Sequence, residues 1–184
     1  PRNFYSNVFS NDTDMEWFLE HVCSKEWILK MDSGVSFKEG ANELKTQYPK
    51  WAPYIEMYDA GWEKMFSGVI DGTVTILKQL KEKNVDVFAI TNWSHEKFDR
   101  GCELFPFFNE FKGVVVSGRE GVVKPDPKIF QIFLDRYQLK ASSCHFIDDL
   151  EVNVQAAESL GFKGHVFKSP QLLRKWLEKR KALI

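Results

Sequence analysis

The pattern of apolar and polar positions divides the chain into two parts. From Thr13 to about Phe66, apolar and aromatic residues recur at intervals of three and four, which is the spacing of one face of a helix. Short β-rich runs are absent from this part. We therefore predict helices only, in the stretches 13–23, 36–48 and 54–66.

After Gly72, amphipathic stretches alternate with short apolar runs. This alternation is typical of right-handed βαβ units and a parallel sheet. We predict an α/β fold in which a doubly wound, Rossmann-like parallel sheet core, residues 69–184, carries a small all-helical insert, residues 1–68. The expected strands are 85–90, 113–117, 144–147 and 164–167, and the expected helices are 73–83, 95–104, 127–137, 151–160 and 170–181.

The composition argues against nucleic acid and membranes as binding partners and favours a small molecule. With 25 Lys and Arg against 26 Asp and Glu, both signs mixed, the chain has no basic patch for nucleic acid or anionic membrane. Its three cysteines, Cys23, Cys102 and Cys144, lack the spacing of a disulfide framework or zinc site. No apolar run or leader predicts a membrane span or signal peptide. We expect a soluble, cytoplasmic protein, compatible with a monomer, that binds a small molecule.

Polar residues follow the first expected strand as Thr91-Asn92-Trp93-Ser94, just before a helix that begins near Ser94 or His95. Ligands of parallel sheets bind at the carboxyl ends of strands, where helix N-termini and loop amides converge. The Thr91 hydroxyl and the Asn92 amide could therefore bind a phosphate oxygen. Ser, Thr and Asn are also the preferred helix caps, and the segment alone favours a cap.

Lys124 lies in the loop after the second expected strand, within Val-Lys-Pro-Asp-Pro. The proline after Lys124 favours an extended backbone, and Pro127 suits the first position of a helix. A fixed ammonium beside a phosphoryl group would neutralise the charge that develops during transfer. Most lysines are simply solvated, but the flanking prolines favour a functional role here.

Two adjacent carboxylates, Asp148 and Asp149, follow the third expected strand, and Asn153 lies in the helix that comes next. Mg²⁺ takes one or two carboxylates together with waters and phosphate oxygens. Asn153 could be a neutral oxygen ligand or could orient the acids. An isolated acidic pair more often caps a helix. A hydroxyl, a lysine and an acidic pair at three successive strand ends instead predict a magnesium-dependent phosphate site.

With these motifs the chain resembles the haloacid dehalogenase (HAD) superfamily over essentially its whole length. Phe-Ala-Ile-Thr-Asn, Val-Lys-Pro-Asp-Pro and Phe-Ile-Asp-Asp-Leu-Glu-Val-Asn look like the second, third and fourth motifs of that family. The helical insert looks like a cap. The likeness is to the group that contains sugar-phosphate phosphatases and the N-terminal phosphatase domain of soluble epoxide hydrolase.

The resemblance implies a role for each site residue. Thr91 would hold the transferring phosphoryl group, Asn92 would touch phosphate or substrate, and Lys124 would bridge nucleophile and phosphate. Mg²⁺ would be bound directly by Asp149, with Asp148 and Asn153 in or next to its coordination shell. The substrate would be a small phosphorylated metabolite.

The first motif of the family, an apolar strand that ends in Asp-x-Asp and carries the nucleophile, is not found in the chain. Asp12 and Asp14 have the spacing, but Thr13 and Glu16 predict a capping box there. Asp71-Gly72-Thr73 is interpreted as a turn into the helix near Thr73. We expect the nucleophile on a strand preceding Pro1, and without it residues 1–184 should not turn over, because phosphoryl transfer depends on positioning.

Three functions remain open at this point. The first is a Mg²⁺-dependent phosphomonoesterase that forms an aspartyl-phosphate. The second is a haloacid dehalogenase-type hydrolase, a reaction that expels halide and needs no metal. The third is a non-catalytic module whose tryptophans contact a protein partner, although aromatics at helical spacing more often form a core. The acidic pair with Lys124 favours phosphate. Substrate choice would lie in the insert, around residues 31–34.

Overall fold

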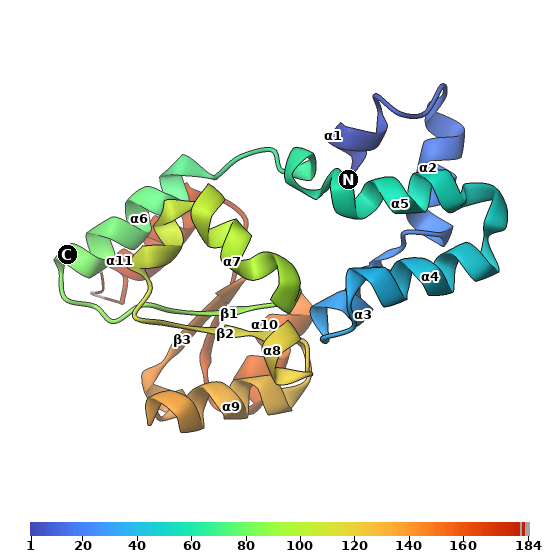
Figure 1. Cartoon of the computed structure of the whole chain (residues 1–184). Coiled ribbons are helices and arrows are strands. Elements are labelled where there is room, and N and C mark those ends of the chain that lie inside the picture. Colours follow the sequence, from blue (N-terminus) through green and yellow to red (C-terminus); the bar gives the residue numbers. More distant parts are fainter. Residues whose placement is uncertain (181, 183–184) are drawn as a thin grey trace.

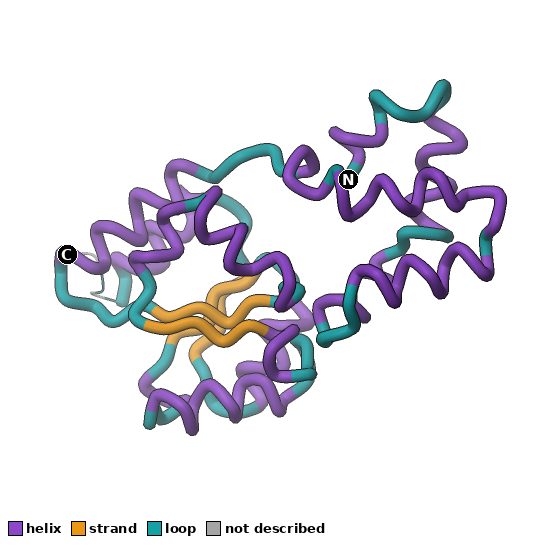
Figure 2. Tube along the Cα trace, in the orientation of Figure 1, coloured by secondary structure: helices purple, strands orange, loops and turns teal. Residues whose placement is uncertain are grey.

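The structure, a computed structural model, describes residues 1–180 and 182. Its N-terminal third is wholly helical, as predicted, and lies to one side of the strands (Figures 1 and 2). An additional helix, α3, separates the first two predicted stretches. The elements of this part are α1 (Arg2–Tyr5), α2 (Asp12–His21), α3 (Lys25–Asp32), α4 (Phe37–Gln47), η1 (Pro49–Trp51), α5 (Ala52–Ala60) and η2 (Trp62–Met65).

Side-chain caps fix where these helices begin. Helix α2 begins after Asn11, whose extended backbone lets its side chain accept a hydrogen bond from the Asp14 amide. Thr13 is therefore already inside the helix, and the predicted Thr13–Glu16 capping box is wrong. A capping box does form at α4, where Ser36 and Glu39 exchange hydrogen bonds.

The remainder of the chain alternates helices and strands, as predicted. Helices α7 and α9 have the predicted limits, since Ser94 caps the first and Asp126 with Pro127 starts the second. The elements are α6 (Asp71–Glu82), β1 (Phe88–Thr91), α7 (His95–Leu104), η3 (Pro106–Glu110), β2 (Gly113–Val116), α8 (Ser117–Glu120), α9 (Pro127–Tyr137), η4 (Ala141–Ser143), β3 (His145–Asp148), α10 (Glu151–Ser159), β4 (Lys163–Val166) and α11 (Pro170–Glu178).

Most other predicted limits shift by one or two residues, the predicted stretch 54–66 divides into α5 and η2, and three further corrections bear on the interpretation. Strand β1 starts at Phe88 and includes Thr91, because the preceding residues carry the chain from the end of α6 back to the sheet. Helix α6 starts at Asp71, which therefore lies in a helical turn and not before it. Helix α11 ends at Glu178, and residue 181, the end of the predicted helix, lies outside the described residues.

The strands form two parallel pairs. Strand β1 pairs with β2, Thr91 lying opposite Val116, and β3 pairs with β4, Asp148 lying opposite Val166. Among the described residues the two pairs belong to separate two-stranded sheets. Parallel strands in an α/β arrangement are confirmed.

Helices cover both faces of the strands, and Figure 1 shows α9 on one side with α6, α7 and α11 on the other. Neighbouring residues of β3 divide between two apolar clusters. Phe146 belongs to the cluster built by α9 and α10, whereas Ile147 packs against the cluster of α6 and α11. This alternation is that of a strand covered on both faces.

The helical part has a core of its own, in which Tyr5, Phe18 and Met31 are completely buried. The division into a cap of residues 1–68 and a core of residues 69–184 stays a prediction. None of the described helices has the length and apolar character that a membrane crossing requires.

Candidate active site

A buried ion pair lies at the carboxyl ends of the strands. Lys124 Nζ lies 2.7 Å from Asp148 Oδ2, and both side chains are almost wholly shielded from solvent. Asp148 is the last residue of β3, and Lys124 belongs to the loop between β2 and α9. The Lys124 ammonium also lies 5.7 Å from the ring centroid of Phe146, a favourable cation–π distance. The structure thus brings together two of the predicted site residues.

The second oxygen of Asp148 is held by the start of α10. Asp148 Oδ1 accepts hydrogen bonds from the Leu150 amide at 2.9 Å and from Asn153 Nδ2 at 3.0 Å. Asn153 is itself buried. Three donors on one carboxylate fix its orientation, because the start of α10 holds one oxygen and the lysine loop holds the other. Asn153 therefore orients Asp148, one of the two roles that the sequence left open.

Asn92 holds the backbone of Lys124. Its Oδ1 accepts from the Lys124 amide at 2.7 Å, and its Nδ2 donates to the Lys124 carbonyl at 3.0 Å. This reciprocal pair fastens the lysine loop to the end of β1. Asn92 is thus seen as a positioning residue, and its predicted contact with phosphate or substrate stays a prediction.

Thr91 and Asp149 keep their polar atoms available. Thr91 ends β1 and is half-buried, and its hydroxyl makes no hydrogen bond within residues 1–180 and 182. Asp149 is exposed, and within the same residues its carboxylate has neither a hydrogen bond nor an ion pair. In the chain, Thr91 directly precedes Asn92 and Asp149 directly follows Asp148, so a free hydroxyl and a free carboxylate flank the network around Lys124.

Buried polar side chains point to one residue, Ser117, that was not predicted from the sequence. The buried polar residues of the described chain are Ser94, Ser117, Asp148 and Asn153; the first three end a strand or follow one within three residues, and Asn153 lies in α10. Ser117, directly after β2, was not predicted to matter. Its hydroxyl accepts from the Trp93 amide at 2.9 Å and donates to the Asp32 carbonyl at 2.6 Å. Ser117 was the last residue of the expected strand 113–117, so its place at a strand end was visible in the sequence, whereas its partners were not.

No group of three or more His, Cys, Asp or Glu side chains in the described part of the chain could hold a metal ion. The predicted set contains only two acids, Asp148 and Asp149, with one amide. Such a set suits Mg²⁺, which completes its octahedron with waters and phosphate oxygens.

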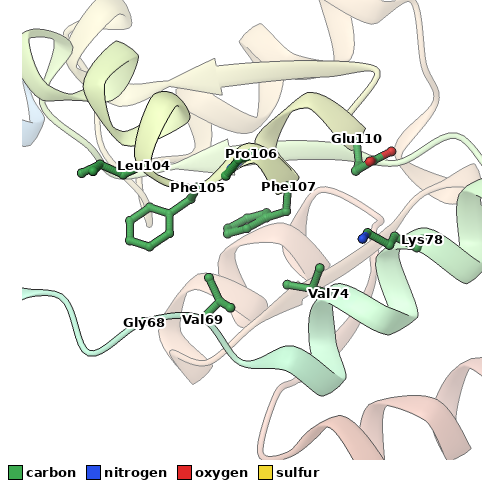
Figure 3. A pocket seen from close by; sticks show the side chains of 9 residues that line it. All are labelled: Gly68, Val69, Val74, Lys78, Leu104, Phe105, Pro106, Phe107 and Glu110. Atoms are coloured by element: carbon green, nitrogen blue, oxygen red, sulfur yellow. The ribbon is translucent and has the colours of Figure 1, made fainter.

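A groove of about 480 Å³ lies elsewhere, between α6 and the segment after α7. Figure 3 shows Val69, Val74, Phe105 and Phe107 around it, with Lys78 and Glu110 at one side. Its lining is mainly apolar and includes none of the predicted site residues. The ion pair, and not this groove, is the candidate active site.

Comparison with known proteins identifies a family to which the chain is similar. The family described as haloacid dehalogenase-like hydrolase matches residues 16–166. Mouse (Mus musculus) acyl-CoA dehydrogenase family member 10 is 36% identical over 103 residues, 55% of this chain and 9% of that protein. A sesquiterpene phosphatase of Aspergillus oryzae is 31% identical over 90 residues, 49% of this chain and 46% of that protein.

Two further proteins resemble the chain. Bifunctional epoxide hydrolase 2 of Sus scrofa is 29% identical over 107 residues, 54% of this chain and 19% of that protein. A HAD family enzyme of Bacteroides thetaiotaomicron, solved with magnesium and inorganic phosphate, has a TM-score of 0.68 and 22% identity, covering 91% of this chain and 84% of that one. The matches span less than half the length of each of the curated relatives.

Proposed function

Because the chain belongs to the haloacid dehalogenase-like hydrolase family, we propose that it is a phosphomonoester hydrolase acting on a small phosphorylated metabolite. The observation that carries this proposal is the buried ion pair of Lys124 and Asp148, with exposed Asp149 beside it. A fixed positive charge stabilises the charge that develops on phosphoryl oxygens. The phosphatase among the relatives and the neighbour solved with phosphate support this choice.

Three side chains would receive the phosphate. Thr91 would donate its unpaired hydroxyl to the transferring phosphoryl group. The Lys124 ammonium, which now binds Asp148, would also donate a hydrogen bond to a phosphoryl oxygen. Asn92 would keep that ammonium in place through its two hydrogen bonds to the Lys124 backbone, and it would lie next to phosphate or substrate. A rigid set of this kind lowers the barrier mainly by positioning.

Asp148, Asp149 and Asn153 would hold Mg²⁺. Their carboxylate and amide oxygens are the hard ligands that this ion prefers, and Asp149 has a free carboxylate to offer. Asp148 is already oriented by Asn153, whose side-chain amide donates to one of its carboxylate oxygens. When bound, the ion would supply positive charge to the phosphate oxygens.

The attacking carboxylate would come from a strand on a segment preceding Pro1. In support, β1 and β3 each lack a second strand partner among residues 1–180 and 182, so each has a free hydrogen-bonding edge. Phe88 and Ile90 of β1 are also only partly buried. A parallel strand between β1 and β3 would satisfy both edges and would end beside Thr91 and Asp148.

A carboxylate at that strand end would attack phosphorus, forming an aspartyl-phosphate and breaking the ester P–O bond. The alcohol would leave, taking up a proton, and water would then cleave the acyl phosphate to release inorganic phosphate. Lys124 would counter the negative charge through both steps.

Phosphate release tests the proposal. The native protein, with any segment that precedes Pro1, is assayed with an aryl phosphate and Mg²⁺, and we expect turnover. Asp149→Asn should lower kcat/KM by at least about a hundredfold, since it removes a carboxylate proposed to hold the Mg²⁺ whose positive charge stabilises the transition state. Asp12→Asn, a matched exposed aspartate on α2, should leave it unchanged.

Other outcomes separate the alternatives. Halide release from a 2-halo acid without phosphate release would indicate the dehalogenase, and neither activity would indicate a non-catalytic module. Full activity of residues 1–184 alone would contradict a nucleophile on a separate strand while leaving the phosphatase proposal intact.

A further inference from the structure

The cap meets the strand ends along a short polar seam, formed by residues 32–37 on the cap side and by residues 93–96 and 117–118 on the core side. The buried Ser117 hydroxyl is its centre, because it binds both the Asp32 carbonyl and the Trp93 amide. On the far side of Trp93 lie Asn92 and Thr91 of the candidate site. The seam therefore links the cap directly to the residues proposed to bind phosphate.

The backbone of Gly34 approaches the backbone of Gly118 closely, so the two sides of the seam are tightly packed there. Gly34 has φ +108°, and a Cβ there would lie 3.1 Å from the Gly118 carbonyl oxygen. A second hydrogen bond crosses the seam from the Phe37 amide to Glu96 Oε2, at 2.7 Å. A side chain at position 34 would separate the two surfaces, so glycine permits the hydrogen bonds on either side of it.

The Asp32 carboxyl group lies within this seam and is partly buried. Burial raises the pKa of Asp32 to about 6, and a contact from the Ser94 backbone N–H opposes that rise. No described Lys, Arg or His forms an ion pair with it, so a charged Asp32 is poorly compensated. Tyr58 on α5 faces the Asp32 carboxyl group, and burial, then Cys23 and Asp32, raises the pKa of that tyrosine. The charged or titratable side chains within or directly next to the core side of the seam are His95, Glu96 and Lys97 on α7 and Arg119 on α8.

We propose that Asp32 is a latch: protonation of its carboxyl group strengthens the docking of the cap on residues 91–94, so the cap is held more firmly in mildly acidic than in alkaline solution. The inference does not depend on the chain being a phosphatase. It concerns the free energy with which the cap docks on the loop after β1.

The sign follows from linkage. An undocked Asp32 is hydrated and has its ordinary pKa near 3.9, below that of the docked group. Docking therefore takes up a proton at pH values between the two, and the stability so gained is fully present below the lower pKa and is lost as pH rises through about 6. At pH values above about 6, docking must bury the negatively charged Asp32 carboxylate.

Amide hydrogen exchange of the chain measures the latch, with rates corrected for the intrinsic effect of pH. Protection of Phe37, whose amide crosses the seam, and of residues 94–97 should fall by about tenfold between pH 5 and pH 8. Protection of α9, on the opposite face, should not follow this trend.

Two substitutions at position 32 separate the latch from a merely structural contact. Asp32→Asn keeps the shape and an acceptor for the Ser94 amide, so protection should stay high and independent of pH. Asp32→Ala removes the contact, so protection should be low throughout. Asp59→Asn, which removes the partner of Lys97 across the same boundary, should keep the native pH slope. A native chain without a slope, or an Asp32→Asn variant that keeps it, overturns the proposal.

Discussion

At the residue scale, the network around Lys124 pairs a buried carboxylate, that of Asp148, with one ammonium group. Asp148 is almost wholly buried and accepts three hydrogen bonds, so it depends on donors that stay in place. Only one of those donors, Lys124, carries a charge. A buried carboxylate that loses its cationic partner keeps its desolvation cost without the Coulomb gain. The same ion pair therefore stabilises the fold and supplies the lysine that is proposed to bind phosphate.

Lys124→Met tests this dependence. The methionine fills a similar volume but leaves the Asp148 charge unpaired, and we expect the free energy of unfolding to fall by about 3–5 kcal/mol. Adding Asp148→Asn should recover a large part of that loss, because no charge then remains buried. Urea unfolding of the two single variants and the double variant measures the coupling.

Lys112→Met is the matched control, since Lys112 pairs with Asp86 in an exposed position and should matter little. Additive losses in the Lys124 cycle, or equal losses for the two lysines, would contradict the role assigned to the buried pair.

At the scale of elements, the sequence predicts helices better than strands. Helices α7 and α9 were predicted to the residue, because Ser94, Asp126 and Pro127 mark their starts locally. The start of β1 was missed by three residues, since a strand extends only as far as its partner pairs with it. The prediction of a cap by Thr13 failed for a similar reason, because the choice between Asn11 and Thr13 rests on backbone conformation.

The same limit applies to the site. Polar residues at strand ends are visible in sequence, so Thr91, Asn92, Lys124 and the acidic pair could be named. Their partners are not visible, because the hydrogen bonds from Asn92 to Lys124 and from Ser117 to Asp32 join segments far apart in the chain. The sequence thus predicts which side chains gather, and packing decides which of them touch.

Helix α11 supplies a prediction at this scale. His165 of β4 stacks on Trp176 of α11 at 4.6 Å, and His145 of β3 meets the same ring edge-on at 5.2 Å. Burial, then Arg180, lowers the pKa of His165, and burial, then Lys163 and Arg180, lowers the pKa of His145. The unfolded chain then binds protons first as pH falls below about 6.5, so these contacts lose stability on acidification.

Thermal unfolding at pH 7.5 and pH 5.5 checks this expectation. Replacing both histidines by phenylalanine keeps the ring contacts and removes the titration, so the double variant should lose less Tm on acidification than the native chain. His21→Phe, which alters an exposed His–Trp stack on the cap, is the control and should leave the native drop. An equal drop in native and double-variant proteins would refute the assignment.

At the scale of the whole molecule, two apolar cores share one chain. The core of the N-terminal helices contains Phe18 and Met31, and the sheet core contains Phe130 and Val115, all completely buried. Polar contacts, including those of the seam and the Arg100–Glu63 pair, join the two parts together with aromatic contacts of Trp62 and Phe66 with Trp93. Parts that each bury a core of their own can open separately, because exposing the boundary costs less than exposing either core.

Phe18→Ala and Phe130→Ala test whether they do. Each removes a fully buried ring and should cost about 3–5 kcal/mol in its own core. Phe18→Ala should therefore speed hydrogen exchange throughout residues 1–65 while β1, β2 and α9 stay protected, and Phe130→Ala should act mainly on the sheet. If Phe18→Ala instead raises exchange equally in α9, the chain unfolds as one cooperative unit. The Asp32 latch would then have to act on global stability, because no separately mobile cap would exist for it to hold.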